Sequence, residues 1–223
     1  LVDDVIMGCV MQVGAQSLNV GRNAVLAAGW PETVPSTSID RQCGSSQQAA
    51  HFGAQGVIAG AYDIVVAAGV EVMSMVPMGA SAMVANVGFP FGPEMTARYD
   101  KVGGIVPQGI SAELIAEKWG LSREDLDTYS AESQRRAAQA RNEGRFDNEI
   151  IPVQAKPIDK ETGKLIETDE IVSADEGIRE GTTVETLANL KPAFKEDGVV
   201  TAGNSSQITD GAAAVLIMSE EKA

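Results

Sequence analysis

The stretch DRQCGSSQQAA, residues 40–50, joins a β-branched run at 34–39 to a run of small residues that favours a helix. Cys43 lies where the predicted strand gives way to that helix. A helix start presents unpaired backbone N–H groups and the positive end of the helix dipole, and both stabilise a thiolate. Cys43 is therefore a candidate nucleophile. The alternative is a buried structural cysteine, which is the commoner role of a lone cysteine.

The neighbouring segments predict further strands and helices. The run DVIMGCVM at 4–11 has the composition of a buried strand, and Cys9 within it is expected to be a core residue. Asn19 can cap a helix through 23–28. Residues 63–71 lack polar alternation, as in a sheet covered on both faces. This alternation of strand and helix predicts a three-layer α/β/α architecture.

The pattern changes over residues 76–110, where prolines and glycines predict an irregular excursion. Helices are expected at 111–119 and after Ser122, a good N-cap for the second one. The apolar segment at 210–218 is expected to be one more buried strand that rejoins the first sheet.

The chain carries 17 basic and 31 acidic residues, for a formal charge of −14. This excess of acidic groups repels phosphate and argues against nucleic-acid and membrane-surface partners. Arg135, Arg136 and Arg141 on the second predicted helix form either a solvated face or a ligand contact. Cys9 and Cys43 make no C-x-x-C pair, and no signal peptide, membrane span or metal-site motif is apparent. We therefore expect a cytoplasmic protein without a bound metal.

Five motifs resemble, in order, those of the thiolase family, whose members are acetyl-CoA acyltransferases. They are CGSSQQAA from Cys43, AAGVEVMSMVP from Ala67, QGISAELIAEKWGLSREDLD from Gln108, DEGIREGTTVETLANLKPAF from Asp175 and VTAGNSSQITDGAAAVLIMS from Val200. Ser46 and the two glutamines after it are most similar to the degradative type, including actinobacterial thiolases of steroid side chains. Pro107–Gln108 replaces the His-Met pair of many biosynthetic members, which also favours the degradative type.

The resemblance implies one half of the family's doubled βαβαβαββ fold, with an inserted α+β loop domain. Residues 1–75 would form the N-terminal α/β domain, 76–196 the CoA-binding loop domain, and 197–223 the strand that returns to the first domain. The family's first strand and helix would precede Leu1, and its C-terminal domain would follow Ala223.

The resemblance also implies the chemistry. Cys43 would attack a 3-ketoacyl-CoA, release acetyl-CoA and pass the shortened acyl group to a second CoA, with its own backbone N–H in the oxyanion hole. Arg179 of DEGIR matches the arginine near the CoA nucleotide. Ser206 of AGNSS matches the serine that hydrogen-bonds the pantetheine arm, and Phe194 of KPAF matches a packing residue in the same cleft. CoA thioesters would be substrates, not permanently bound cofactors.

Each of these ligand roles has an alternative. Arg179 could form a surface ion pair with Asp175 or Glu176. Ser206 could cap a turn, and Phe194 could be an ordinary core residue.

The family's catalytic histidine and acid/base cysteine belong to its C-terminal domain. His51, the only histidine of the sequence, lies on a segment that does not match the catalytic one, so a packing or interface role is expected. We expect this chain alone to be inactive and to expose apolar surface that promotes association. The complete protein is expected to be a homodimer or homotetramer formed around residues 34–40.

Two other classes of function stay open. One is a non-catalytic thiolase-like carrier of acyl-CoA or sterols, in which Cys43 is idle. The other is a decarboxylating condensing enzyme of the ketoacyl synthase type, which shares the doubled fold. Such enzymes usually lack the AGNxSxxxDGAAA pattern found here at 202–214.

Overall fold

The computed structural model describes residues 2–159 and 161–223 and divides into two compact units. Unit 1 comprises the chain up to Pro90 together with Ile208–Ala223, and unit 2 comprises Phe91–Gln207. Both divisions fall later in the chain than the expected positions 76 and 197.

Contacts within each unit explain why the divisions fall later. The hydroxyl of Ser81 lies 3.7 Å from the sulfur of Met11, which keeps the residues after position 76 with unit 1. The backbone N–H groups of Val199 and Val200 both donate to Glu113, which keeps the residues after position 197 with unit 2.

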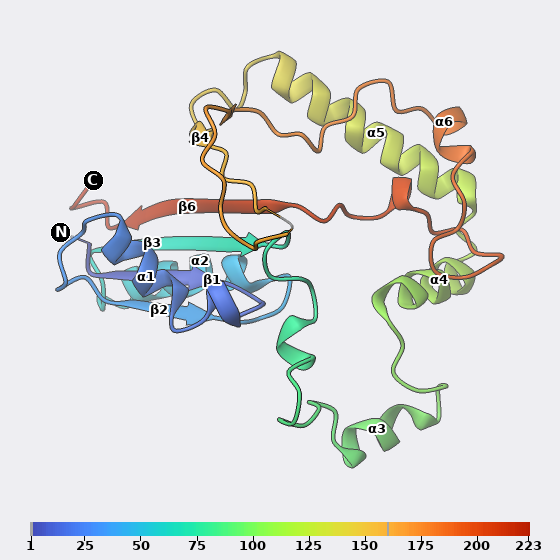
Figure 1. Ribbon diagram of the computed structural model, residues 1–223, viewed down its shortest axis with the longest axis horizontal. Helices are drawn as coiled ribbons and strands as arrows, with labels where there is room; N and C mark the ends of the chain where they lie inside the picture. The colour runs from blue at the N-terminus through green and yellow to red at the C-terminus, as the bar shows by residue number, and fades with distance from the viewer. Residues whose placement is uncertain (1, 160) are drawn as a thin grey trace. The chain divides into compact units, whose positions relative to one another are not determined.

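Unit 1 is built on a four-stranded mixed sheet in the order β2-β1-β3-β6 (Figure 1). Strand β1 (Asp4–Gly8) pairs in parallel with β2 (Ser36–Ile39) and with β3 (Ile64–Val72). Strand β6 (Asp210–Met218), drawn in red, pairs antiparallel with β3. The C-terminal segment thus rejoins, as expected, a sheet that the first third of the chain begins, but seven of the nine residues of β6 are exposed, so the expectation of a buried strand is wrong.

Helices cover both faces of this sheet. Val5 packs with Val25 of α1 (Val20–Ala27), whereas Ile6 packs with Ala49 of α2 (Ser45–Ile58). Because successive strand residues point to opposite faces, α1 and α2 lie on opposite sides of the sheet. The predicted three-layer α/β/α architecture is therefore confirmed. The predicted cap is also observed, since Asn19 accepts a hydrogen bond from the first turn of α1.

Unit 2 is mainly helical. Its principal elements are α3 (Pro93–Asp100), α4 (Gln108–Trp119), α5 (Arg123–Asn142), the two-stranded sheet of β4 (Val153–Gln154) and β5 (Ile171–Val172), and α6 (Val184–Ala188). Ser122 caps α5, as the sequence predicted, and the structure adds a capping box between Ser122 and Asp125. The part of the chain that the structure describes also has three 3₁₀ turns: η1 (Gly14–Gln16), η2 (Ala80–Ala82) and η3 (Ala202–Asn204).

Helix α3 corrects the expectation of an irregular excursion over 76–110. Pro93 occupies the first helical position, where its missing N–H costs nothing, and Glu94 faces the positive end of the helix dipole. A proline taken as a helix breaker in the sequence is therefore a helix start. Within residues 2–159 and 161–223, no helix combines the length and apolar character that a membrane span requires.

Candidate active site

Cys43 lies in the turn that connects β2 to α2. Strand β2 ends at Ile39, and α2 begins at Ser45 with Gly44 as its N-cap. Cys43 is therefore one residue outside the cap and not in the first turn of the helix itself. Cys43 is an exposed residue, so a reactant has access to its thiol.

Short hydrogen bonds fix the shape of this turn. The Ser45 hydroxyl donates to the carbonyl of Gln42 at 2.6 Å and accepts from the N–H of Arg41 at 2.9 Å. Asp40 accepts from the N–H of Gln42 at 2.7 Å. Gln42 is held at φ +49°, a left-handed conformation that costs a non-glycine residue ~1–2 kcal/mol. The backbone thus turns sharply immediately before Cys43.

Two strand glycines let α2 approach the sheet at this turn. A Cβ added to Gly8 of β1 would lie 2.4 Å from the backbone nitrogen of Ser46. A Cβ added to Gly69 of β3 would lie 2.6 Å from the Cβ of Ser46. The first turn of α2 therefore rests on backbone, and this close contact sets the position of the Cys43 turn. We did not single out these glycines in the sequence, although an isolated glycine in a strand is a signal of close backbone approach.

Cys9 occupies a different environment from Cys43. It follows β1, is 1% exposed and was correctly predicted as a core residue. Burial, together with the nearby charges of Glu71 and Asp40, raises the pKa of the Cys9 thiol to about 11. Cys9 is therefore a neutral thiol at physiological pH.

We expect iodoacetamide to alkylate Cys43 in the folded chain near pH 8 and to spare Cys9. The thiolate is the reacting species, and Cys9 holds its proton until the pH approaches about 11. Because the folded-state pKa of Cys9 lies above the unfolded one, its contribution to stability is complete at neutral pH and is lost as the pH rises through about 11. Peptide mass spectrometry after alkylation, with Cys43→Ala as control, measures this. Rapid labelling of Cys9 near pH 8 without denaturant would contradict it.

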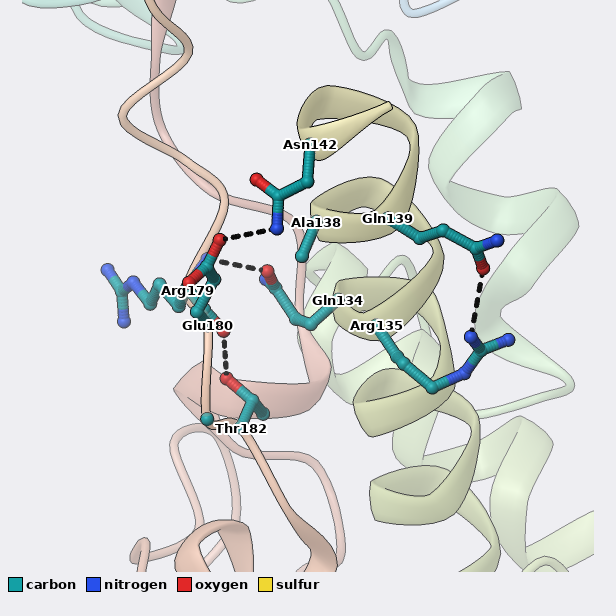
Figure 2. A pocket seen from close by; sticks show the side chains of 9 residues that line it. Gln134, Arg135, Ala138, Gln139, Asn142, Arg179, Glu180 and Thr182 are labelled. Atoms are coloured by element: carbon teal, nitrogen blue, oxygen red, sulfur yellow. Dashed lines mark hydrogen bonds between the residues drawn. The ribbon is translucent and has the colours of Figure 1, made fainter. Parts of the chain in front are cut away.

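Arg179 lies at a pocket of about 340 Å³ beside α5, shown in Figure 2. Its N–H donates to the side chain of Gln134 at 2.8 Å, and its carbonyl accepts from the Thr182 hydroxyl at 2.8 Å. In Figure 2 the guanidinium extends away from α5. These hydrogen bonds of the Arg179 backbone fix the chain at this residue and leave the guanidinium available to a ligand.

The alternative role of Arg179 as a surface ion pair is not observed. Within the described residues, neither Asp175 nor Glu176 forms a salt bridge with it, and Asp175 instead accepts from the N–H of Gly177 at 2.7 Å.

The arginine cluster of α5 is already paired. Arg135 and Arg136 both form salt bridges with Glu132, and their hydrogen bonds lower the pKa of that carboxyl to about 2. Arg141 pairs with Glu180. These arginines match the interpretation of a solvated face, because each is paired with a carboxylate at the surface.

The structure also does not match the alternative roles of Ser206 and Phe194, which were a turn cap and an ordinary core residue. Ser206 is exposed, and the nearby 3₁₀ turn is capped by Thr201. Phe194 is 47% exposed and not part of a core. Its ring lies against the backbone of Gly109, where an added Cβ would be 2.2 Å from a ring carbon.

Unit 2 contains Arg179, Ser206 and Phe194, and unit 1 contains Cys43. Hydrogen bonds link the three segments of unit 2. Gln207, next to Ser206, donates from its side chain to the carbonyl of Gly177 at 2.7 Å, two residues before Arg179. Ala193, next to Phe194, donates to the carbonyl of Val200 at 2.9 Å.

His51 is exposed on α2. In the described part of the chain, no group of three or more histidine, cysteine or acidic residues could hold a metal ion.

Comparison with known proteins gives matches along the length of the chain. The family model described as "Thiolase, N-terminal domain" matches residues 1–221. A probable acetyl-CoA acyltransferase of Staphylococcus aureus (strain COL) is 42% identical over 228 residues, covering 100% of this chain and 56% of that protein. A 3-ketoacyl-CoA thiolase of Bacillus subtilis (strain 168) is 42% identical over 223 residues, covering 100% of this chain and 55% of that protein. The chain spans about half the length of the curated relatives it matches.

Proposed function

Since the chain belongs to the thiolase family and matches its N-terminal domain, we propose that it supplies the nucleophile and the CoA-binding residues of an acetyl-CoA acyltransferase. The observation that carries this proposal is the exposed Cys43 in a strained turn at the carboxyl end of β2. A strained backbone at an exposed thiol is typical of a catalytic nucleophile.

In the proposed reaction, the thiolate of Cys43 attacks the 3-keto carbon of a 3-ketoacyl-CoA. The carbon–carbon bond next to that carbon then breaks, and its electron pair leaves with acetyl-CoA, which takes up a proton. The acyl group remains on the Cys43 sulfur as a thioester until the thiolate of a second CoA displaces it. Covalent catalysis thus divides one difficult cleavage into two acyl transfers. The backbone N–H of Cys43 is proposed as one donor to the oxyanion.

We assign CoA binding to unit 2. The exposed guanidinium of Arg179 suits the phosphates of the nucleotide, because arginine donates paired hydrogen bonds to phosphate oxygens. Ser206 offers an exposed hydroxyl to the amides of the pantetheine arm, and the half-exposed ring of Phe194 offers an apolar contact. The chain carries net negative charge, so these local groups must provide the attraction for an anionic ligand.

Proton transfer to the leaving acetyl-CoA is assigned to a C-terminal thiolase domain. Unit 1 has apolar side chains that such a domain would cover: Phe52 and Ile58 of α2 are 45% and 86% exposed, and Val215 and Leu216 of β6 are 58% and 54% exposed. Exposed apolar surface of this kind marks interaction sites.

We expect the isolated 223-residue chain to be inactive in thiolysis and to self-associate. Burying the apolar side chains of α2 and β6 against another copy is favourable when the natural cover is absent. Multi-angle light scattering of the purified chain measures its mass, with Leu216→Glu as a variant expected to reduce association. A stable monomer with a sharp thermal transition would contradict this expectation.

The remaining features of the proposal concern assembly and pathway. Among the described residues, strand β2 is an edge of its sheet and pairs only with β1, so its other side is available to a second copy in a homodimer or homotetramer. The CGSSQQAA motif and Pro107–Gln108 favour a degradative role in lipid or steroid β-oxidation. The proposed location is the cytoplasm.

The proposal is tested by supplying this chain with a C-terminal thiolase domain and assaying CoA-dependent cleavage of a 3-ketoacyl-CoA. A carrier would bind the thioester without forming an acyl group on Cys43. Mass spectrometry of the Cys43 peptide therefore separates an enzyme from a carrier. Binding without cleavage or acylation would favour the carrier.

A further inference from the structure

Asp127 of α5 is a buried carboxylate that the proposed reaction does not use. Its side chain is 1% exposed. One oxygen accepts from Arg123 Nε at 2.7 Å, and the other accepts from the side-chain amide of Asn204 at 3.0 Å. A buried carboxylate is costly unless donors satisfy both of its oxygens. Here one donor comes from its own helix and the other from the loop after Val199.

Asn204 connects Asp127 to the backbone of that loop. Its amide nitrogen also donates to the carbonyl of Val199 at 3.0 Å, and its amide oxygen accepts from the N–H of Thr201 at 2.7 Å. The carbonyl of Thr201 in turn accepts from the hydroxyl of Ser205 at 2.6 Å. The bonds of this network therefore fix the loop up to the residue before Ser206.

We infer that Asp127 is a positioning residue of the CoA site, which acts through Asn204 to hold Ser206 where it can hydrogen-bond the pantetheine arm. This inference rests on the proposed function, because it takes the CoA role of Ser206 from it. Ser206 is exposed, and its placement depends on the bonds of the residues before it. A ligand hydrogen bond from a loop hydroxyl retains its strength only when the loop is held in place.

Glu113 of α4 anchors the other end of the same segment. Its two oxygens accept from the N–H groups of Val199 and Val200, each at 2.9 Å. This second buried carboxylate holds the start of the loop independently of Asp127. A change at Asp127 is therefore expected to loosen residues 201–206 and to leave the packing of α4 intact.

The test is an Asp127→Asn substitution in the 223-residue chain, with CoA binding measured by isothermal titration calorimetry. Arg123 and Asn204 both donate hydrogen bonds to Asp127. One of these donors must therefore face the amide nitrogen of the new asparagine and lose its hydrogen bond. We expect CoA to bind about three- to ten-fold more weakly, which corresponds to the net free energy of one hydrogen bond. Glu124→Gln, at an exposed position in the first turn of α5, is the matched control and should leave CoA affinity unchanged.

A double-mutant cycle separates positioning from a general loss of stability. If Asp127 acts through Ser206, then Asp127→Asn should weaken CoA binding no further in a Ser206→Ala background. A purely structural role would lower the melting temperature and weaken binding equally in both backgrounds. Asn204→Ala breaks the same link and keeps the ion pair of Asp127 with Arg123, so it serves as a second variant if Asp127→Asn does not fold.

The outcomes distinguish this inference from the proposed function. Wild-type affinity in Asp127→Asn or Asn204→Ala, or equal weakening in both backgrounds, would overturn the positioning role alone. If Ser206→Ala leaves CoA affinity unchanged, or if the unchanged chain binds no CoA, then the proposed ligand role fails and the positioning role fails with it.

Discussion

Replacing Cys43 with alanine is expected to abolish CoA-dependent cleavage of a 3-ketoacyl-CoA by the chain assembled with a C-terminal thiolase domain. Removing a covalent nucleophile lowers turnover by on the order of 10⁴- to 10⁶-fold in enzymes of this kind of mechanism. No acyl group should appear on the protein when it is incubated with substrate, because Cys9 is buried and protonated. The measurement combines a cleavage assay with intact-protein mass spectrometry.

The control for this substitution is Cys9→Ala, which removes the other thiol of the chain and leaves the exposed turn unchanged. It should retain cleavage and acylation. CoA affinity should survive in Cys43→Ala, since the assigned CoA residues belong to unit 2. Cleavage that persists in Cys43→Ala would refute the covalent mechanism. An acyl group found on Cys9 would refute the assignment of the nucleophile.

The sequence was sufficient to predict the layers of unit 1 because each layer has a local signal. The apolar run at 4–11 contains β1, the run at 63–71 contains all of β3 except its last residue, and the small residues after Cys43 form α2. The position of Cys43 between strand and helix was also predictable to within a residue or two, the usual uncertainty of helix ends. The three-layer arrangement followed from alternation alone.

Other features depend on contacts between segments far apart in the sequence, which local patterns do not encode. Asn204 and Asp127 are separated by 77 residues, and nothing in either segment indicates that they meet. The start of α3 at Pro93 was missed because proline is both a helix breaker and a favoured first residue. The roles of Arg179 and Ser206 rest on family resemblance, since an exposed arginine or serine has no distinctive pattern of its own.

The second large effect is expected from Gly8→Ala, which should destabilise the fold and displace the Cys43 turn. The added Cβ would lie 2.4 Å from the backbone nitrogen and 2.7 Å from the Cα of Ser46, so α2 must move away from β1. Backbone cannot rotate aside as a side chain can. We expect a loss of about 3 kcal/mol in unfolding free energy and a melting temperature lower by roughly 6–12 °C.

Gly211→Ala is the matched control, because Gly211 is also a strand glycine and an added Cβ there would meet no atom within 4 Å. Its stability should stay within about 0.5 kcal/mol of the unchanged chain. Iodoacetamide labelling of Cys43, and its acylation in the chain assembled with a C-terminal thiolase domain, should fall in Gly8→Ala and not in Gly211→Ala. If Gly8→Ala melts and reacts as the unchanged chain does, then the contact between α2 and β1 does not set the position of Cys43. A loss of stability with full Cys43 reactivity would restrict the role of Gly8 to folding, because the turn at Gln42 would then hold the thiol in place without it.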